Sequence, residues 1–155
     1  MTKILFVCLG NICRSPLAEA IFHQEIRRRR LTDRFYAESC GTANYHVGDA
    51  PDPRTIANAA RNGTPIQHVG RQFEVADFKK FDLILAMDAS NRMNLLRLPD
   101  AKNFQDKIKM MRSYDTVDRG ADVPDPYTGG EEDFQEVYDI LRRSVGSLVD
   151  SLTKA

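Results

Sequence analysis

Residues 4–15 read ILFVCLGNICRS and combine an apolar run, a short loop and the start of a helix. The leading apolar residues are typical of a buried strand. The run ends at Cys8, and a loop containing Gly10 and Asn11 leads to Pro16, where a helical pattern begins. The free backbone N–H groups of such a loop and of the first helical turn converge on one point, which suits a tetrahedral oxyanion such as phosphate.

Cys8 and Arg14 give this cradle, defined as residues 8–15, its chemical character. The positive end of the helix and the guanidinium group both favour a thiolate, which is the nucleophilic form of cysteine. The planar fork of Arg14 also matches phosphate oxygens. The spacing alone is weak, because a cysteine and an arginine six residues apart arise by chance roughly 0.3 times in such a chain. The strand before and the helix after favour a phosphate cradle over the alternative, a buried and inert cysteine.

Length and composition predict one domain, residues 1–155, with 42% apolar and 28% charged residues. The formal net charge is +0, so the overall balance suggests neither nucleic acid nor an anionic membrane as a partner. The chain lacks a signal-peptide pattern and an apolar stretch of the roughly 20 residues that span a membrane. The 3 cysteines lack the spacing of a disulfide framework, so we expect a reducing, cytoplasmic location.

Helical and strand patterns alternate along the chain. They predict helices over residues 17–30, 53–62, 74–79, 88–98 and 131 to near the end. Besides the opening strand at residues 4–7, they predict strands over residues 35–39, 81–87 and 107–111. This order predicts an α/β fold, a doubly wound parallel sheet of four strands with helices on both faces. In such sheets ligands bind beyond the carboxyl ends of the strands, where Cys8 is expected. Gly146 interrupts the last helix at a cost of about 1 kcal/mol relative to alanine, so we expect a packing reason for it.

A proton donor is the part that the cradle does not provide. Cleaving a phosphate monoester through a thiol requires a nucleophile, groups that stabilise the equatorial oxygens, and an acid for the departing oxygen. Asp125 is our candidate acid, because it lies in an irregular loop over residues 113–130 that can fold over the cradle. From the residues alone, a turn-forming role for an aspartate before proline explains Asp125 equally well. Asp122 is the fallback acid.

The chain resembles the low molecular weight protein tyrosine phosphatase family. The motifs that carry the resemblance are VCLGNICRSP at residues 7–16, SCGT at 39–42, PDPR at 51–54, AMDASN at 86–91, SYD at 113–115 and DPY at 125–127. They cover essentially the whole chain. The resemblance implies a flavodoxin-like strand order 2-1-3-4 and hydrolysis of phosphotyrosine in protein substrates through a cysteinyl phosphate, with Asp125 as the general acid. The reaction needs no metal, and the chain shows no His/Cys/Asp spacing typical of a metal site, so we expect no cofactor. We expect a monomer, with a weak dimer as the alternative.

The resemblance also implies roles for residues around the cradle. Ser15 would bond to the sulfur of Cys8, and Asn11 with Ser39 and His68 would hold the shape of the cradle. Asn11 also suits a loop position with positive φ on its own chemistry. The residues implied to bind substrate are Leu9, Gly10, Asn11, Ile12, Cys13, Ser15, Tyr45 and Tyr127.

Two residues of the cradle refine these expectations. Relatives that act on phosphoarginine have threonine at the position of Ile12, so the isoleucine favours phosphotyrosine. Cys13 lies across a curved loop from Cys8, which predicts a reversible disulfide that would protect Cys8 from irreversible oxidation. One departure is Thr128, which stands where eukaryotic members often have a second tyrosine after the Asp-Pro pair. Regulation through a second tyrosine is therefore not implied.

Two other functions could use a cradle of this kind. Arsenate reductases resemble this fold and use the same cradle, but they need further cysteines after the third strand, where this chain reads LAMDASNRM at residues 85–93. A non-catalytic phosphopeptide-binding module would be expected to lack the nucleophile or the acid, whereas both are present here.

Overall fold

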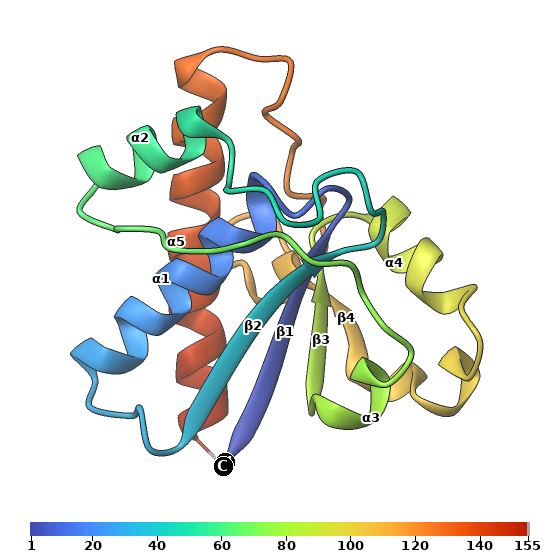
Figure 1. Ribbon diagram of the computed structural model, residues 1–155. Helices are drawn as coiled ribbons and strands as arrows, with labels where there is room; N and C mark the ends of the chain where they lie inside the picture. Colours follow the sequence, from blue (N-terminus) through green and yellow to red (C-terminus); the bar gives the residue numbers. More distant parts are fainter. Residues whose placement is uncertain (155) are drawn as a thin grey trace.

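The computed structural model describes residues 1–154, which fold around one four-stranded parallel sheet (Figure 1). Its strands are β1 (Thr2–Cys8), β2 (Phe35–Gly41), β3 (Leu83–Ala86) and β4 (Ile108–Met110). Their order in the sheet is β2-β1-β3-β4, with Phe6 of β1 opposite Ser39 of β2 and Leu85 of β3. The predicted fold class and strand order are confirmed.

Helices cover both faces of this sheet. They are α1 (Arg14–Arg28), α2 (Pro53–Arg61), α3 (Asp77–Lys80), α4 (Ala89–Leu96) and α5 (Glu131–Thr153), with short 3-10 helices η1 (Ala101–Asn103), η2 (Gln105–Lys107) and η3 (Met111–Tyr114). Figure 1 shows α1 and α5 together on one face, with α3 and α4 on the other. Among the helices of residues 1–154, none has both the length and the apolar character needed to cross a membrane.

The central strand β1 explains the unbroken apolar run that opens the chain. Ile4 and Phe6 point into the core shared with α1 and α5, whereas Leu5 and Val7 point into the core on the opposite face. All four side chains are 0% exposed. A strand buried on both faces needs apolar residues at every position rather than at alternate ones.

The starts of α2 and α4 follow the capping chemistry of the sequence, whereas α1 and α3 are shifted by about three residues at their starts. Asp52 caps α2 by accepting the N–H of Arg54, and Asp88 caps α4 by accepting that of Asn91. The first helix begins at Arg14 rather than at residue 17, because Pro16 fits within the first helical turn, where its missing N–H has no intrahelical partner to lose.

The expected packing reason for Gly146 is wrong. A Cβ atom at this position would meet no heavy atom within 4 Å. Its carbonyl accepts a hydrogen bond from Arg29 Nη2 at 3.3 Å, which is a main-chain contact that any residue could make. The glycine therefore weakens α5 without a compensating close approach.

Candidate active site

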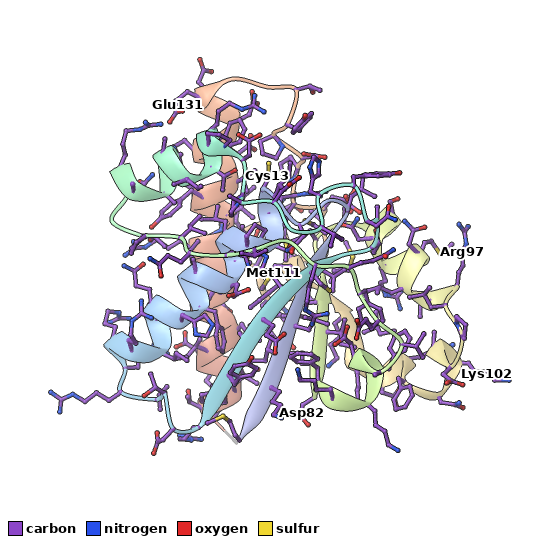
Figure 2. All side chains as sticks on the ribbon, in the orientation of Figure 1. Cys13, Asp82, Arg97, Lys102, Met111 and Glu131 are labelled. Carbon is purple, nitrogen blue, oxygen red and sulfur yellow. The ribbon has the colours of Figure 1, made fainter. Side chains whose placement is uncertain are left out.

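The sulfur of Cys8 lies at the floor of the cradle. Cys8 ends β1 at the carboxyl edge of the sheet and is 3% exposed. Its Sγ lies 2.9 Å from Ser15 Oγ and accepts the backbone N–H of Asn11 at 3.3 Å. Figure 2 shows Cys13 of the same loop near the start of α1, at the opposite end of the sheet from Asp82. Hydrogen-bond donors therefore point at the sulfur, and such donors stabilise the negative charge of a thiolate.

Asn11 holds the cradle through four hydrogen bonds of its side chain. It has a φ of 58°, in the left-handed region that asparagine tolerates better than most residues. Its Nδ2 donates to Ser15 Oγ at 2.7 Å and to Ser39 Oγ at 3.1 Å. Its Oδ1 accepts from His68 Nε2 at 2.7 Å and from the backbone N–H of Arg71 at 3.1 Å. The structure thus brings together the three residues of the expected network.

Glu19 extends this network and was missed by the sequence reasoning. Its Oε1 lies 3.5 Å from His68 Nδ1, so the ring faces a carboxylate on one side and Asn11 on the other. A usable signal was its position four residues after Ser15, which places both on one face of α1.

Arg14 is buried at the side of the cradle and points across it. Its side chain is 3% exposed, and Nη1 donates to Asp88 Oδ2 at 2.7 Å and to the carbonyl of Val123 at 3.0 Å. Burial opposes the charge, but the neighbouring Cys8 and Asp88 raise the pKa of Arg14 above its ordinary value. The guanidinium is therefore a fixed cation facing the anion site.

Asp88 caps α4, as the sequence allows for either Asp88 or Ser90, and its second contact was missed. The carboxylate serves both purposes, because Oδ1 accepts the N–H of Asn91 at 2.7 Å while Oδ2 binds Arg14. The signal was its position just after β3, the strand beside β1, at the edge of the sheet where the cradle lies.

Asp125 lies in the acid loop, defined as residues 115–130 between η3 and α5, and reaches the mouth of the cradle. Its Oδ2 is 3.7 Å from Arg14 Nη2, and its side chain is 50% exposed. Its Oδ1 accepts the N–H of Tyr127 at 3.1 Å, so both interpretations of the sequence describe real contacts. Asp122, the fallback, instead accepts the N–H of Ala89 at 2.9 Å.

A cavity of about 200 Å³ opens above the sulfur. The residues that line it are Cys8, Leu9, Gly10, Ile12, Cys13, Arg14, Tyr45, His46, Asp125 and Tyr127. Tyr45 and Tyr127 are 71% and 50% exposed, as expected for walls at a mouth. His46 was missed. Asn11 and Ser15 are absent from this lining, because their side chains are buried beneath the loop. Binding of substrate by these two residues therefore stays a prediction, and it concerns their backbone N–H groups.

Cys13 is 5% exposed, and burial raises the pKa of its thiol to about 12, so it is protonated at neutral pH. All three cysteines are free thiols in the structure. Within residues 1–154, no cluster of three or more His, Cys, Asp or Glu side chains could hold a metal ion.

Comparison with known proteins identifies the family. The model of the low molecular weight phosphotyrosine protein phosphatase family matches residues 3–155. The chain belongs to this family. A Schizosaccharomyces pombe protein described as a low molecular weight phosphotyrosine protein phosphatase is 44% identical over 142 residues. The match covers 89% of this chain and 90% of that protein.

Solved structures match this chain in both fold and length. A protein tyrosine phosphatase from Entamoeba histolytica superimposes with a TM-score of 0.94 at 40% identity, covering 99% of this chain and 98% of that one. A drosophila arginine phosphatase superimposes with a TM-score of 0.88 at 32% identity, covering 97% and 98%. The two similar structures are thus described differently, one as a protein tyrosine phosphatase and the other as an arginine phosphatase.

Proposed function

We propose that this chain hydrolyses phosphotyrosine in proteins through a phosphocysteine at Cys8. The observation that carries the proposal is the buried sulfur at the floor of an anion cavity, with Arg14 beside it and Asp125 at the mouth. Membership of the phosphatase family supports the same reaction.

In the first half-reaction, the Cys8 thiolate attacks phosphorus while the bond from phosphorus to the phenolic oxygen breaks. Arg14 and the backbone N–H groups of the cradle stabilise the equatorial oxygens. Asp125 gives its proton to the departing oxygen, so that neutral tyrosine leaves. The hydroxyl of Ser15, 2.9 Å from the sulfur, stabilises the thiolate before attack.

The second half-reaction uses the same groups in reverse. The Asp125 carboxylate takes a proton from water as the water oxygen attacks phosphorus. The sulfur–phosphorus bond breaks, inorganic phosphate forms, and Cys8 returns as a thiolate that Ser15 and the N–H of Asn11 stabilise.

The walls of the slot favour phosphotyrosine over phosphoarginine. Ile12 lines the cavity with an apolar side chain, and the rings of Tyr45 and Tyr127 stand at its mouth. The apolar side chain of Ile12 suits a phenyl ring better than a charged guanidinium, which would lose its hydration against it. Because a drosophila relative is described as an arginine phosphatase, peptides carrying each modification should be compared directly.

Cys13 is proposed as a redox partner of Cys8. Peroxide would oxidise the Cys8 thiolate to a sulfenic acid with loss of water, and the Cys13 thiol would then displace a second water to form the disulfide. The high pKa of Cys13 leaves Cys8 as the sulfur that peroxide attacks first. Mass spectrometry after mild peroxide should find the two linked, and an unlinked, over-oxidised Cys8 would exclude this route. Recovery of the thiols from such a disulfide needs a reducing compartment, and we propose the cytoplasm. We also propose that the enzyme is a monomer.

A rapid-quench experiment with labelled substrate tests the central proposal. Label should appear on Cys8 within the first turnover, and turnover should survive a chelator and be inhibited by vanadate. Steady-state hydrolysis without any phosphorus on residue 8 would refute the covalent route.

A further inference from the structure

Arg54 connects parts of the active site and has no role in the mechanism above. It lies in the first turn of α2, and its side chain is 45% exposed. Its Nε and Nη2 donate to the two carboxylate oxygens of Asp52 at 3.1 and 2.9 Å. Nη2 also donates to the carbonyl of Tyr127 at 2.8 Å. Its Cζ lies 5.5 Å from the ring centre of Tyr127 and 4.7 Å from that of Phe134.

One end of this connection is fastened to the cradle. The backbone N–H of Asp52 donates to the carbonyl of Ile12 at 2.8 Å. The Asp52 carboxylate also caps α2 by accepting the N–H of Arg54 at 2.9 Å. Because the paired guanidinium of Arg54 holds the pKa of this carboxyl below its usual range, Asp52 is ionised at neutral pH. Arg54 is thus linked through Asp52 to Ile12, which lies in the wall of the cavity.

The other end is fastened to the turn that carries the acid. Arg54 binds the carbonyl of Tyr127, while the N–H of Tyr127 donates to Asp125 Oδ1. In the part of the chain that the structure describes, polar contacts from outside the acid loop reach residues 125–127 from Arg54 and Arg14. The Arg14 contact is long, at 3.7 Å, and a bound phosphate would compete for that guanidinium. Arg54 is free of that competition.

Figure 1 shows the same arrangement at the level of the chain. The segment before α5 (orange) rises from the carboxyl edge of the sheet to the start of α5, on the side where α2 lies. Helices α2 and α5 pack against each other. Arg54 on α2 is therefore placed to hold this segment from the side, with Phe134 in the first turn of α5 beneath its guanidinium.

We propose that Arg54 is a positioning residue that holds the turn of residues 125–127 over the cradle, so that the Asp125 carboxyl faces the leaving group. The inference rests on the proposed function and deepens it. Arg54 itself transfers no proton and contacts no reacting atom. Its planar fork suits this role, because parallel N–H donors bind both oxygens of Asp52 and still reach the carbonyl of Tyr127, a geometry that a compact ammonium group matches less well.

The test compares two esters that differ in their need for an acid. Phenyl phosphate has a basic leaving group, whereas 2,4-dinitrophenyl phosphate has one that departs without a proton. For Arg54→Met, we expect kcat/KM to fall about tenfold with phenyl phosphate and less than about twofold with the dinitrophenyl ester. Arg54→Lys should show the same selective loss to a smaller extent.

Arg61→Met is the matched control. Arg61 lies on the same helix, is similarly exposed and pairs with Glu131 of α5, but it makes no contact with residues 125–127. Its kcat/KM should equal that of the wild type for both esters. Equal losses on the two esters for Arg54→Met, or no loss on either, would overturn the inference.

A double-mutant comparison separates positioning from general damage. In the Asp125→Asn background, Arg54→Met should add less than about a twofold loss with phenyl phosphate, because the group it positions is gone. A full tenfold further loss would overturn the inference. The trapped phosphocysteine of the wild type is measured alongside, so that failure of the proposed function, seen as no trapped label, is distinct from failure of the role of Arg54.

Discussion

The cradle and the acid loop meet at one slot but are held in opposite ways. In the cradle, the supporting side chains of Asn11 and Ser15 are 1% and 0% exposed and are fixed by buried hydrogen bonds. At the tip of the acid loop, the side chains of Asp125 and Tyr127 are each 50% exposed. The contrast teaches that the proposed anion site is built as part of the core, whereas the proposed proton donor stands at the exposed mouth of the cavity.

The base of the acid loop is buried, like the cradle and unlike the tip of the loop. Asp115 is 0% exposed and accepts hydrogen bonds from Arg143 Nε at 2.7 Å and Arg112 Nε at 2.9 Å. Arg112 also donates to the carbonyl of Asp122 at 2.9 Å. The loop is therefore anchored at its root and exposed at its tip.

Removing the nucleophile of the cradle gives the largest expected effect, because no other group in the cradle can take its place. Cys8→Ser should reduce hydrolysis of p-nitrophenyl phosphate at mildly acidic pH to background, a loss of at least about 10⁴-fold. The alkoxide that would have to attack is far harder to form than a thiolate. Phosphate binding by the variant, measured by calorimetry, should persist, which shows that the fold and the anion site are intact. Substantial turnover by this variant would contradict the proposed reaction.

Removing the acid tests the tip of the loop. Asp125→Asn should lower kcat/KM for phenyl phosphate by about 10²- to 10⁴-fold, the usual contribution of general acid catalysis. The loss should shrink for a better leaving group. Asp122→Asn is the control, because its carboxylate binds the N–H of Ala89 instead. If the two variants lost activity equally, Asp125 would not be the acid.

Changing the buried base of the loop should affect stability rather than chemistry. Asp115→Asn should lower the free energy of unfolding at pH 7 by about 3 kcal/mol, because it leaves two arginines without their buried partner. The exposed Asp118, 4.0 Å from Arg112 and 69% exposed, provides the control. Asp118→Asn should change the unfolding free energy by less than about 0.5 kcal/mol in urea titrations.

The effect of Asp115 should also depend on pH. Hydrogen bonds from Arg143 hold the pKa of Asp115 well below its ordinary value. Its stabilisation is therefore fully present above about pH 4, where the unfolded carboxyl is ionised, and is lost as pH falls further. The difference in the free energy of unfolding between the wild type and Asp115→Asn should narrow below pH 4. A gap that stays constant down to pH 2 would show that charge is not its cause.

The smallest predicted effect lies in α5, away from both regions. Gly146→Ala should raise the free energy of unfolding by about 1 kcal/mol without changing kcat/KM, since a Cβ atom there meets open space. Gly63 offers a matched contrast, because it also has open space but a φ of 83°. Gly63→Ala should destabilise by about 1 kcal/mol. Stabilisation by both substitutions would mean that backbone conformation does not decide the sign.

Most of the fold could be predicted because its signals are local. The apolar run of β1, the Asp52 cap before Pro53 and the periodicity of α5 each report on neighbouring residues in the chain. The family motifs then supplied the strand order, which no local pattern encodes. Gly146 was misjudged for the same reason, since whether a neighbour approaches a helix depends on the distant packing around it.

The candidate site was predictable where one motif contains its parts, as with Cys8 and Arg14. The missed contacts join distant segments: Asp88 to Arg14, Glu19 to His68, and Arg54 to Tyr127. Each pairs a charged or polar group with a partner chosen by the fold rather than by spacing. Sequence patterns could identify the helix cap at Asp88, but its second partner becomes visible only when the sheet edge is assembled.

The side-chain amide of Asn11 has a consequence for inhibitor discovery. Both of its ends are already occupied by protein partners. The floor of the pocket is therefore preorganised before any ligand binds, so a phosphate mimic can be designed against a fixed geometry. Selectivity is better sought in the part of the compound that faces the mouth, where the lining residues Asp125 and Tyr127 are exposed.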